Sequence, residues 1–364
     1  MKKILYFLIP TLLFLSCIEK YDVPLRSETP KLVIEGSINT GLPPYQIKLS
    51  YSGVFEYATL LPNDAVINSA KVLLSDNQGN STNFRYLGKG IYQSTNLKFR
   101  GKAGLTYSLN IVLPNGRVFV SKPEKMPSIV PVQKAYGEYI VNYFTRQESA
   151  GYIGYYPAEP DGPTGYRIFI DTKDPAGEKN YYRWTGNSIT RRFTKGTSCG
   201  FFTLCDQTCF VPTNYEQLNI LSDQLFDGNQ IIKKPLFLTS VFVTGRMYIE
   251  VNQWNYTREA YQFWQRYQEQ TTATGSILDP LPAAIEGNVY NQDKPSELAL
   301  GYFSAASLFK KRLTIDVTDP YQLPRGNVFP REGGCASEVY LKRGAYAVDN
   351  WPSPLDWATE DPNK

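Results

Sequence analysis

Alternation of apolar and polar residues is the dominant pattern of the chain, and it predicts strands. Residues 46–51 alternate strictly, and residues 105–113 repeat the pattern over a longer stretch. A period of two places one face of a strand against a core. Asn115-Gly116 and the cluster at 76–79 predict tight turns between such strands. About seven short strands within residues 31–125 therefore predict an immunoglobulin-like β-sandwich.

The second region, residues 126–364, is also predicted to be rich in β structure. Three prolines within residues 122–131 mark the boundary between the two regions. A loop at 174–180 with Gly177 predicts a hairpin, and Thr244-Gly245 predicts a second strand pair. The predicted fold class is therefore mainly β, with an immunoglobulin-like β-sandwich followed by a second β-rich domain.

One amphipathic helix is predicted near residues 256–270. Asn255 or Thr257 is suited to cap its first turn, which also holds Glu259. Its apolar side is formed by residues at helical spacing, namely Ala260, Phe263, Trp264 and Tyr267.

The chain opens with an apolar run that stops at a cysteine. Lys2 and Lys3 precede the run, which is too short to span a membrane as a helix and fits a signal peptide over residues 1–16. Residues 13–17 resemble the lipobox of bacterial lipoproteins, so Cys17 is the predicted lipidation site. Several acyl chains on Cys17 would make a durable membrane anchor. The alternative is a buried strand at the N-terminus.

Residues 17–30 are predicted to be a lipid-anchored tether, because they are polar and contain prolines. Acidic residues soon after Cys17 resemble the surface-export signal of Bacteroidota lipoproteins. The predicted location is therefore the outer membrane, with the protein lipid-anchored and exposed at the cell surface.

Composition narrows the chemistry that the chain is expected to perform. It has no histidine, the usual general base and metal ligand, so Ser-His-Asp catalysis and histidine-based zinc sites are excluded. The 38 basic and 34 acidic side chains are nearly balanced, which argues against nucleic acid as a partner. Glycoside hydrolysis by a carboxylate pair stays open, although no acid pair stands out. We predict no cofactor and no catalytic residue.

Four cysteines remain if Cys17 is lipidated, and they are disulfide candidates: Cys199, Cys205, Cys209 and Cys335. An even number in an exported protein favours two disulfides, with three connectivities open. Their spacing does not match a zinc site, so no metal is predicted there.

Two further groups of residues allow a functional and a structural interpretation. Asp174, Glu178 and Asn180 offer calcium ligands, but a turn around Gly177 explains them without an ion. Tyrosine and tryptophan clusters suit sugar stacking or partner binding, and they also fill β cores. Arg183 stands between two aromatic residues and is suited to stack or pair within the fold.

Several motifs together resemble a family of Bacteroidota outer-membrane lipoproteins known by domain of unknown function 4249. The motifs that carry the resemblance lie at residues 88–94, 101–121, 174–184, 260–264, 286–290 and 301–305. The resemblance implies a non-enzymatic accessory of a TonB-dependent outer-membrane transporter, and it supplies no catalytic residues. A free-standing adhesion or glycan-binding module is the alternative function.

Overall fold

The computed structural model describes residues 30–53, 66–140, 144–149, 152–157, 165–194, 198–200, 203–204, 207–240, 245–272 and 285–317. The described part is mainly β, as predicted, with one α-helix beside a short 3-10 turn. Its strands form one 13-stranded sheet, one three-stranded sheet and two small hairpins. The predicted signal peptide and the predicted tether up to residue 29 lie outside these residues.

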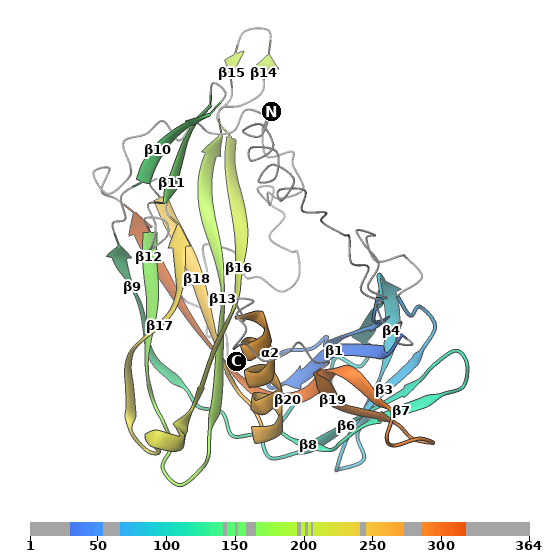
Figure 1. Cartoon of the computed structure of the whole chain (residues 1–364). Coiled ribbons are helices and arrows are strands. Elements are labelled where there is room, and N and C mark those ends of the chain that lie inside the picture. The colour runs from blue at the N-terminus through green and yellow to red at the C-terminus, as the bar shows by residue number, and fades with distance from the viewer. Residues whose placement is uncertain are drawn as a thin grey trace, which may run out of the picture.

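The N-terminal strands close into a barrel-like sheet, which we call the barrel (Figure 1). The order is β1-β2-β5-β4-β3-β6-β7-β19-β20, and a parallel pairing of β1 with β20 closes it. The bounds are β1 Leu32–Asn39, β2 Gln46–Tyr51, β3 Lys71–Asp76, β4 Ser81–Gly88, β5 Ile91–Ser94, β6 Thr106–Val112, β7 Val118–Ser121, β19 Glu286–Asn291 and β20 Leu298–Val317. β8, Glu124–Lys125, pairs with β6.

The alternating residues fill the interior of the barrel as their period predicts. Ile47 and Leu49 of β2, and Leu109 and Ile111 of β6, are all buried. The turns at 76–79 and at Asn115-Gly116 join paired neighbours, β3 to β4 and β6 to β7. An immunoglobulin-like sandwich is not confirmed, because these strands form one continuous sheet that borrows β19 and β20 from the far end of the chain.

The remaining strands form two sheets packed face to face, which we call the two-sheet region. One sheet has the order β17-β12-β9, and the other continues the large sheet through β20-β18-β13-β16. The bounds are β9 Val132–Ile140, β12 Gly165–Lys173, β13 Tyr181–Thr194, β16 Gln207–Ser222, β17 Gln230–Ser240 and β18 Gly245–Asn255. Tyr182, Trp184 and Ile249 from one sheet meet Ile168 and Ile170 from the other in a common core.

Smaller elements complete this region: β10 Phe144–Ser149, β11 Tyr152–Pro157, β14 Ser198–Gly200, β15 Thr203–Leu204 and the 3-10 turn η2 Asp223–Leu225. β10 pairs with β11, and β14 pairs with β15.

Both hairpins predicted in this region are wrong. The loop around Gly177 joins β12 to β13, but β12 pairs with β9 and β17 while β13 pairs with β16 and β18. The segment around Thr244-Gly245 likewise leads from β17 to β18, which belong to different sheets. A turn signal predicts where the chain reverses. It does not determine whether the two flanking strands pair in one sheet or lie in two sheets that pack face to face.

β20 belongs to both halves of the molecule. It pairs with β1 up to Ala306 and with β18 from Ser307 onward, so the ladder passes from one partner to the other without a gap. Gly301 in this strand has a φ of +79°, and a Cβ there would lie 2.1 Å from the carbonyl oxygen of Ile34. Only glycine allows β1 to approach β20 so closely.

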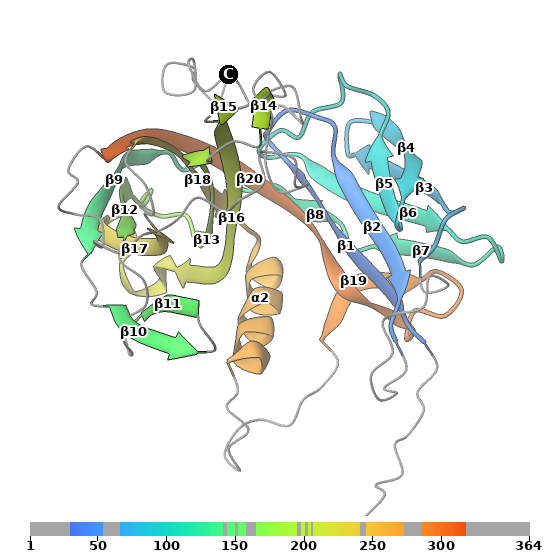
Figure 2. The ribbon, with the colours of Figure 1, turned by 90° about the horizontal axis from the view of Figure 1, so that it is seen from above.

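The predicted helix is confirmed as α2, Arg258–Thr271, which lies between the two halves (Figure 2). Thr257 is its N-cap, since its side chain accepts a hydrogen bond from the Ala260 N–H at 3.2 Å. Asn255 instead accepts from the Tyr181 N–H at 3.0 Å and belongs to β18. Among the described helices, none combines the length and the apolar character that crossing a membrane requires.

Candidate functional site

A cleft of about 630 Å³ lies where the barrel, the two-sheet region and α2 meet. Its barrel side comes from residues 33–37 of β1 and residues 300–304 of β20. Its other side comes from β13, β16 and the end of β18, and α2 supplies a further wall. The volume falls within the range of small-molecule sites, roughly 300–1,000 Å³.

Aromatic rings line this cleft. Phe263, Trp264 and Tyr267 project from α2, because positions three and four apart share a helix face. The Trp264 ring lies edge-on to Tyr267 with centroids 5.9 Å apart, and Phe263 lies 5.2 Å from Tyr302 of β20. Trp254 adds a further ring from β18, and its Nε1 donates to the Thr185 hydroxyl at 3.1 Å. Such faces suit flat or ring-shaped ligands.

Arg183 is the cation of the cleft. Its guanidinium carbon lies 4.0 Å from the centre of the Trp264 ring, a cation–π contact. Its Nη2 lies 3.6 Å from a carboxylate oxygen of Glu216. Burial raises the pKa of the Tyr256 hydroxyl, and the adjacent Arg183 partly opposes that rise. The structure thus shows that Arg183 both stacks and pairs inside the fold, as expected.

A second pocket of about 480 Å³ borders α2 near its N-terminus and contains a buried carboxylate, Glu124 of β8. Glu124 accepts hydrogen bonds from the hydroxyls of Tyr302 at 2.5 Å and Thr257 at 2.8 Å, and from the Asn288 amide at 3.1 Å. Burial raises the pKa of Glu124, and these three donors partly offset the rise. Burial and the neighbouring Glu124 carboxylate also raise the pKa of Tyr302. This network joins β8, β19, β20 and the start of α2.

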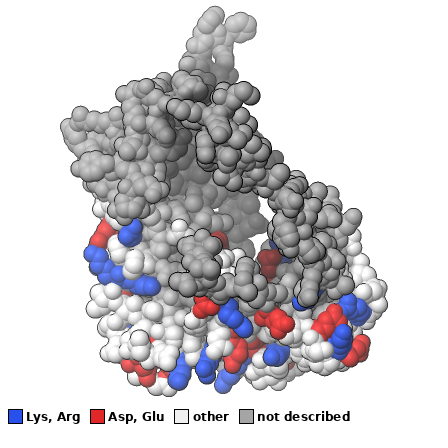
Figure 3. Space-filling view, in the orientation of Figure 1, with Lys and Arg blue, Asp and Glu red and all other residues white. Residues whose placement is uncertain are grey.

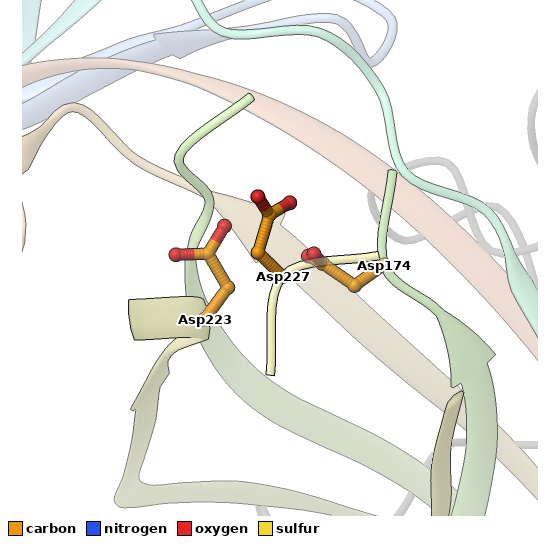
Figure 4. A group of neighbouring side chains, drawn as sticks. All are labelled: Asp174, Asp223 and Asp227. Carbon is orange, nitrogen blue, oxygen red and sulfur yellow. The ribbon is translucent and has the colours of Figure 1, made fainter. Parts of the chain in front are cut away.

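Three aspartates form the only potential metal-binding group found among the described residues (Figure 4). One oxygen of each of Asp174, Asp223 and Asp227 lies within 4.8 Å of the others. Of the three residues considered as calcium ligands from the sequence, only Asp174 belongs to this group, and its neighbours there come from the connection between β16 and β17. Asn180 uses its side chain to contact the Glu178 carbonyl and the Asn255 amide.

The aspartates already have hydrogen-bond donors in the protein. Asp174 accepts from the Tyr182 hydroxyl at 2.5 Å and from the Gly228 N–H at 2.9 Å. Asp223 accepts from the Asn180 N–H at 2.6 Å. Burial, followed by the charges of Asp174 and Asp227, raises the pKa of Asp223, although hydrogen bonds from Asn180 act the other way. These hydrogen bonds explain the cluster without an ion, because they join the β12–β13 connection to the β16–β17 connection.

Charged side chains on the described part of the face in Figure 3 have mixed signs. Lysine and arginine lie beside aspartate and glutamate, and no extended patch of one sign covers that part of the face.

The predicted cysteine sites are only partly within the described residues. Cys199 lies in β14 and Cys209 in β16. Cys17, Cys205 and Cys335 lie outside the described residues, so the lipidation site and the disulfides stay predictions.

A family model described as a domain of unknown function (DUF4249) matches residues 18–312. The chain belongs to the DUF4249 family. The match covers the barrel, α2 and nearly all of the described two-sheet region, so the cleft of this DUF4249 member lies entirely within the matched residues. No curated protein and no solved structure matches the chain.

Proposed function

We propose that this DUF4249 member is a non-enzymatic lipoprotein that captures a small ligand for a TonB-dependent outer-membrane transporter. The cleft between the barrel and the two-sheet region carries the proposal. It has the volume of a small-molecule site, aromatic walls and one stacked arginine. Such a site binds a molecule by shape and stacking without needing a general acid or base.

We propose that Cys17 carries the lipid anchor and that residues 17–30 hold the folded part above the membrane. The lipobox-like segment supports this anchor, and the family match supports it too, because it begins at residue 18, directly after the cysteine. The acidic residues that follow support display on the outer surface. We further propose the barrel as a divergent immunoglobulin-like scaffold, which its short, turn-linked antiparallel strands β2 to β7 support.

The decisive experiment is a pull-down from the native outer membrane with a C-terminal tag, comparing wild type with Cys17→Ala. We expect wild type to recover one TonB-dependent receptor in stoichiometric amount and the unlipidated variant to recover far less. Wild type that is membrane-bound but recovered alone would refute the transporter role. Glycan binding by a free-standing surface module would then be the function to test.

A matched pair of variants assigns the role of the cleft. Trp264→Ala removes the ring that stacks on Arg183, whereas Leu225→Ala removes a side chain that is 94% exposed on η2 and is not part of the cleft lining. We expect only Trp264→Ala to abolish binding of the ligand that co-purifies with the receptor complex.

A further inference from the structure

Two polar groups that line the cleft are buried without a hydrogen-bond partner in the described structure. They are Arg183 Nε and Trp264 Nε1. Both are donors. A buried donor without an acceptor is unfavourable, and proteins retain such groups where a ligand or an ordered water completes them. A ligand that completes these two donors would supply acceptor oxygens.

The arginine is held in an orientation that favours one kind of acceptor. Stacking on Trp264 fixes the guanidinium plane, and the Arg183 side chain is only 12% exposed. Nε and Nη2 lie on the same edge of the guanidinium and form a planar fork that matches the two oxygens of a carboxylate. Nε has no partner, and the Glu216 oxygen lies 3.6 Å from Nη2, beyond hydrogen-bond distance. The Tyr256 hydroxyl is a further polar neighbour of this guanidinium.

The acidic residues of the cleft do not accept hydrogen bonds from Nε and Nη2 of Arg183. The Glu216 side chain is 70% exposed, so it is free to turn into solvent at little cost. Glu35, the other carboxylate of the lining, lies 3.4 Å from the Lys48 ammonium in an exposed ion pair.

We propose that the cleft binds a ligand that joins a carboxylate to a ring able to stack on aromatic side chains, and that the Arg183 fork takes this carboxylate in place of Glu216. The ring then lies among Trp264, Tyr267 and Tyr302. This inference rests on the proposed function and specifies the class of molecule captured. Acidic sugars and aromatic acids share this chemistry, and the experiment separates the two sources.

The test is isothermal titration of the mature full-length protein in mild detergent with two matched pairs of probes. One pair is trigalacturonic acid and neutral galactotriose, and the other is phenylacetate and 2-phenylethanol. We expect the acid of one pair to bind at least tenfold more tightly than its neutral counterpart. The pair that shows the difference identifies the source.

Two variants with opposite expected effects keep the test independent of folding. Arg183→Lys keeps the positive charge but loses the fork, so the preference for the acid should fall at least tenfold. Glu216→Gln removes the competing carboxylate at an exposed position, so the acid should bind several-fold more tightly while the neutral probe is unchanged. Thermal unfolding confirms that each variant is folded.

Equal binding of acid and neutral probes, or no binding of either acid at millimolar concentration, would overturn the inference. So would an unchanged acid preference in Arg183→Lys. None of these results affects recovery of the receptor in the pull-down, so failure of the carboxylate inference is distinguishable from failure of the proposed function.

Discussion

The barrel and the two-sheet region satisfy their buried polar groups with different side chains. In the barrel, hydroxyls serve strand N–H groups: Ser94 accepts from Tyr45 N–H and Ser121 from Leu109 N–H, both at 2.9 Å. In the two-sheet region, carboxylates accept from buried donors: Asp174 accepts from the Tyr182 hydroxyl, and Asp223 accepts from the Asn180 N–H.

Glu250 extends the contrast. This carboxylate is buried in β18 and contacts Lys310 Nζ and Arg312 Nε, each at 2.9 Å. Hydrogen bonds to neutral hydroxyls contribute the same stability across a wide pH range, whereas the contribution of a buried charge depends on its partners and on pH. Apart from Glu124 at its junction with the other half, the barrel is therefore expected to depend little on pH, and the two-sheet region to be the electrostatically sensitive part.

The largest effect is expected from Glu250→Ala. Removing this carboxylate leaves two closely packed cations, Lys310 and Arg312, without their shared anion. Breaking a buried ion pair by removing one partner costs about 3–5 kcal/mol. Denaturant unfolding measures the loss, and Glu138→Ala is the control, since its ion pair with Lys233 is exposed. Equal losses in the two variants would show that the buried charge of Glu250 matters no more to the two-sheet region than an exposed one.

In the barrel, Ser121→Ala is expected to lower the free energy of unfolding by about 1–3 kcal/mol, because the buried Leu109 N–H loses its acceptor. This loss should be the same at every pH from 4 to 8, roughly, since a serine hydroxyl does not titrate there. Urea unfolding at several pH values measures it. A loss that varies with pH would show that charge also supports the barrel.

Glu124 offers a test at the junction of the halves. Its pKa is raised in the folded state, so the folded protein keeps this proton after the unfolded chain has lost it. Its contribution to stability therefore falls as pH rises from the ordinary value of 4.5 up to the raised folded pKa. Glu124→Gln should remove this slope and change stability at pH 7 by about 1 kcal/mol or less.

The measurement is the midpoint of thermal unfolding across that pH window for both proteins. Glu35→Gln serves as the matched control, because Glu35 is an exposed carboxylate of the same barrel. A slope that persists in Glu124→Gln would assign the titration to another group, such as Asp223.

The smallest effect is expected from Asp227→Asn. The substitution removes a negative charge that helps to raise the pKa of Asp223, while its side-chain oxygen still accepts from the Gly177 N–H. We expect a stabilisation of about 0.5 kcal/mol or less, and no change of either protein with millimolar calcium. A calcium-dependent rise in the unfolding midpoint of wild type, absent from the variant, would show an ion site instead.

The sequence predicted elements well where the signal is local. Alternation identified β2 and β6, helical spacing identified α2, and Asn115-Gly116 identified the turn between β6 and β7. The same reasoning failed for sheet membership. The turns at Gly177 and Thr244-Gly245 join strands of different sheets, since pairing depends on partners far away in the chain.

Only some residues of the candidate site could be predicted from the sequence. Trp264 and Tyr267 stood out by their helical spacing, and Arg183 by its aromatic neighbours. Glu216 and Glu124 carried no local signal, because an isolated glutamate gains its role only from the residues that the fold brings to it. Tyr302 lies within the motif at 301–305, which assigns no role to its side chain; the structure places it at both the cleft and Glu124.

The shared strand β20 has a mechanical consequence. It pairs with β1 up to Ala306 and with β18 from Ser307, so one continuous, hydrogen-bonded strand connects the two halves rigidly. A large hinge motion between the halves would strain this continuous ladder. The binding geometry is thus largely preorganised, and small-angle scattering curves of the empty and ligand-saturated protein should superimpose.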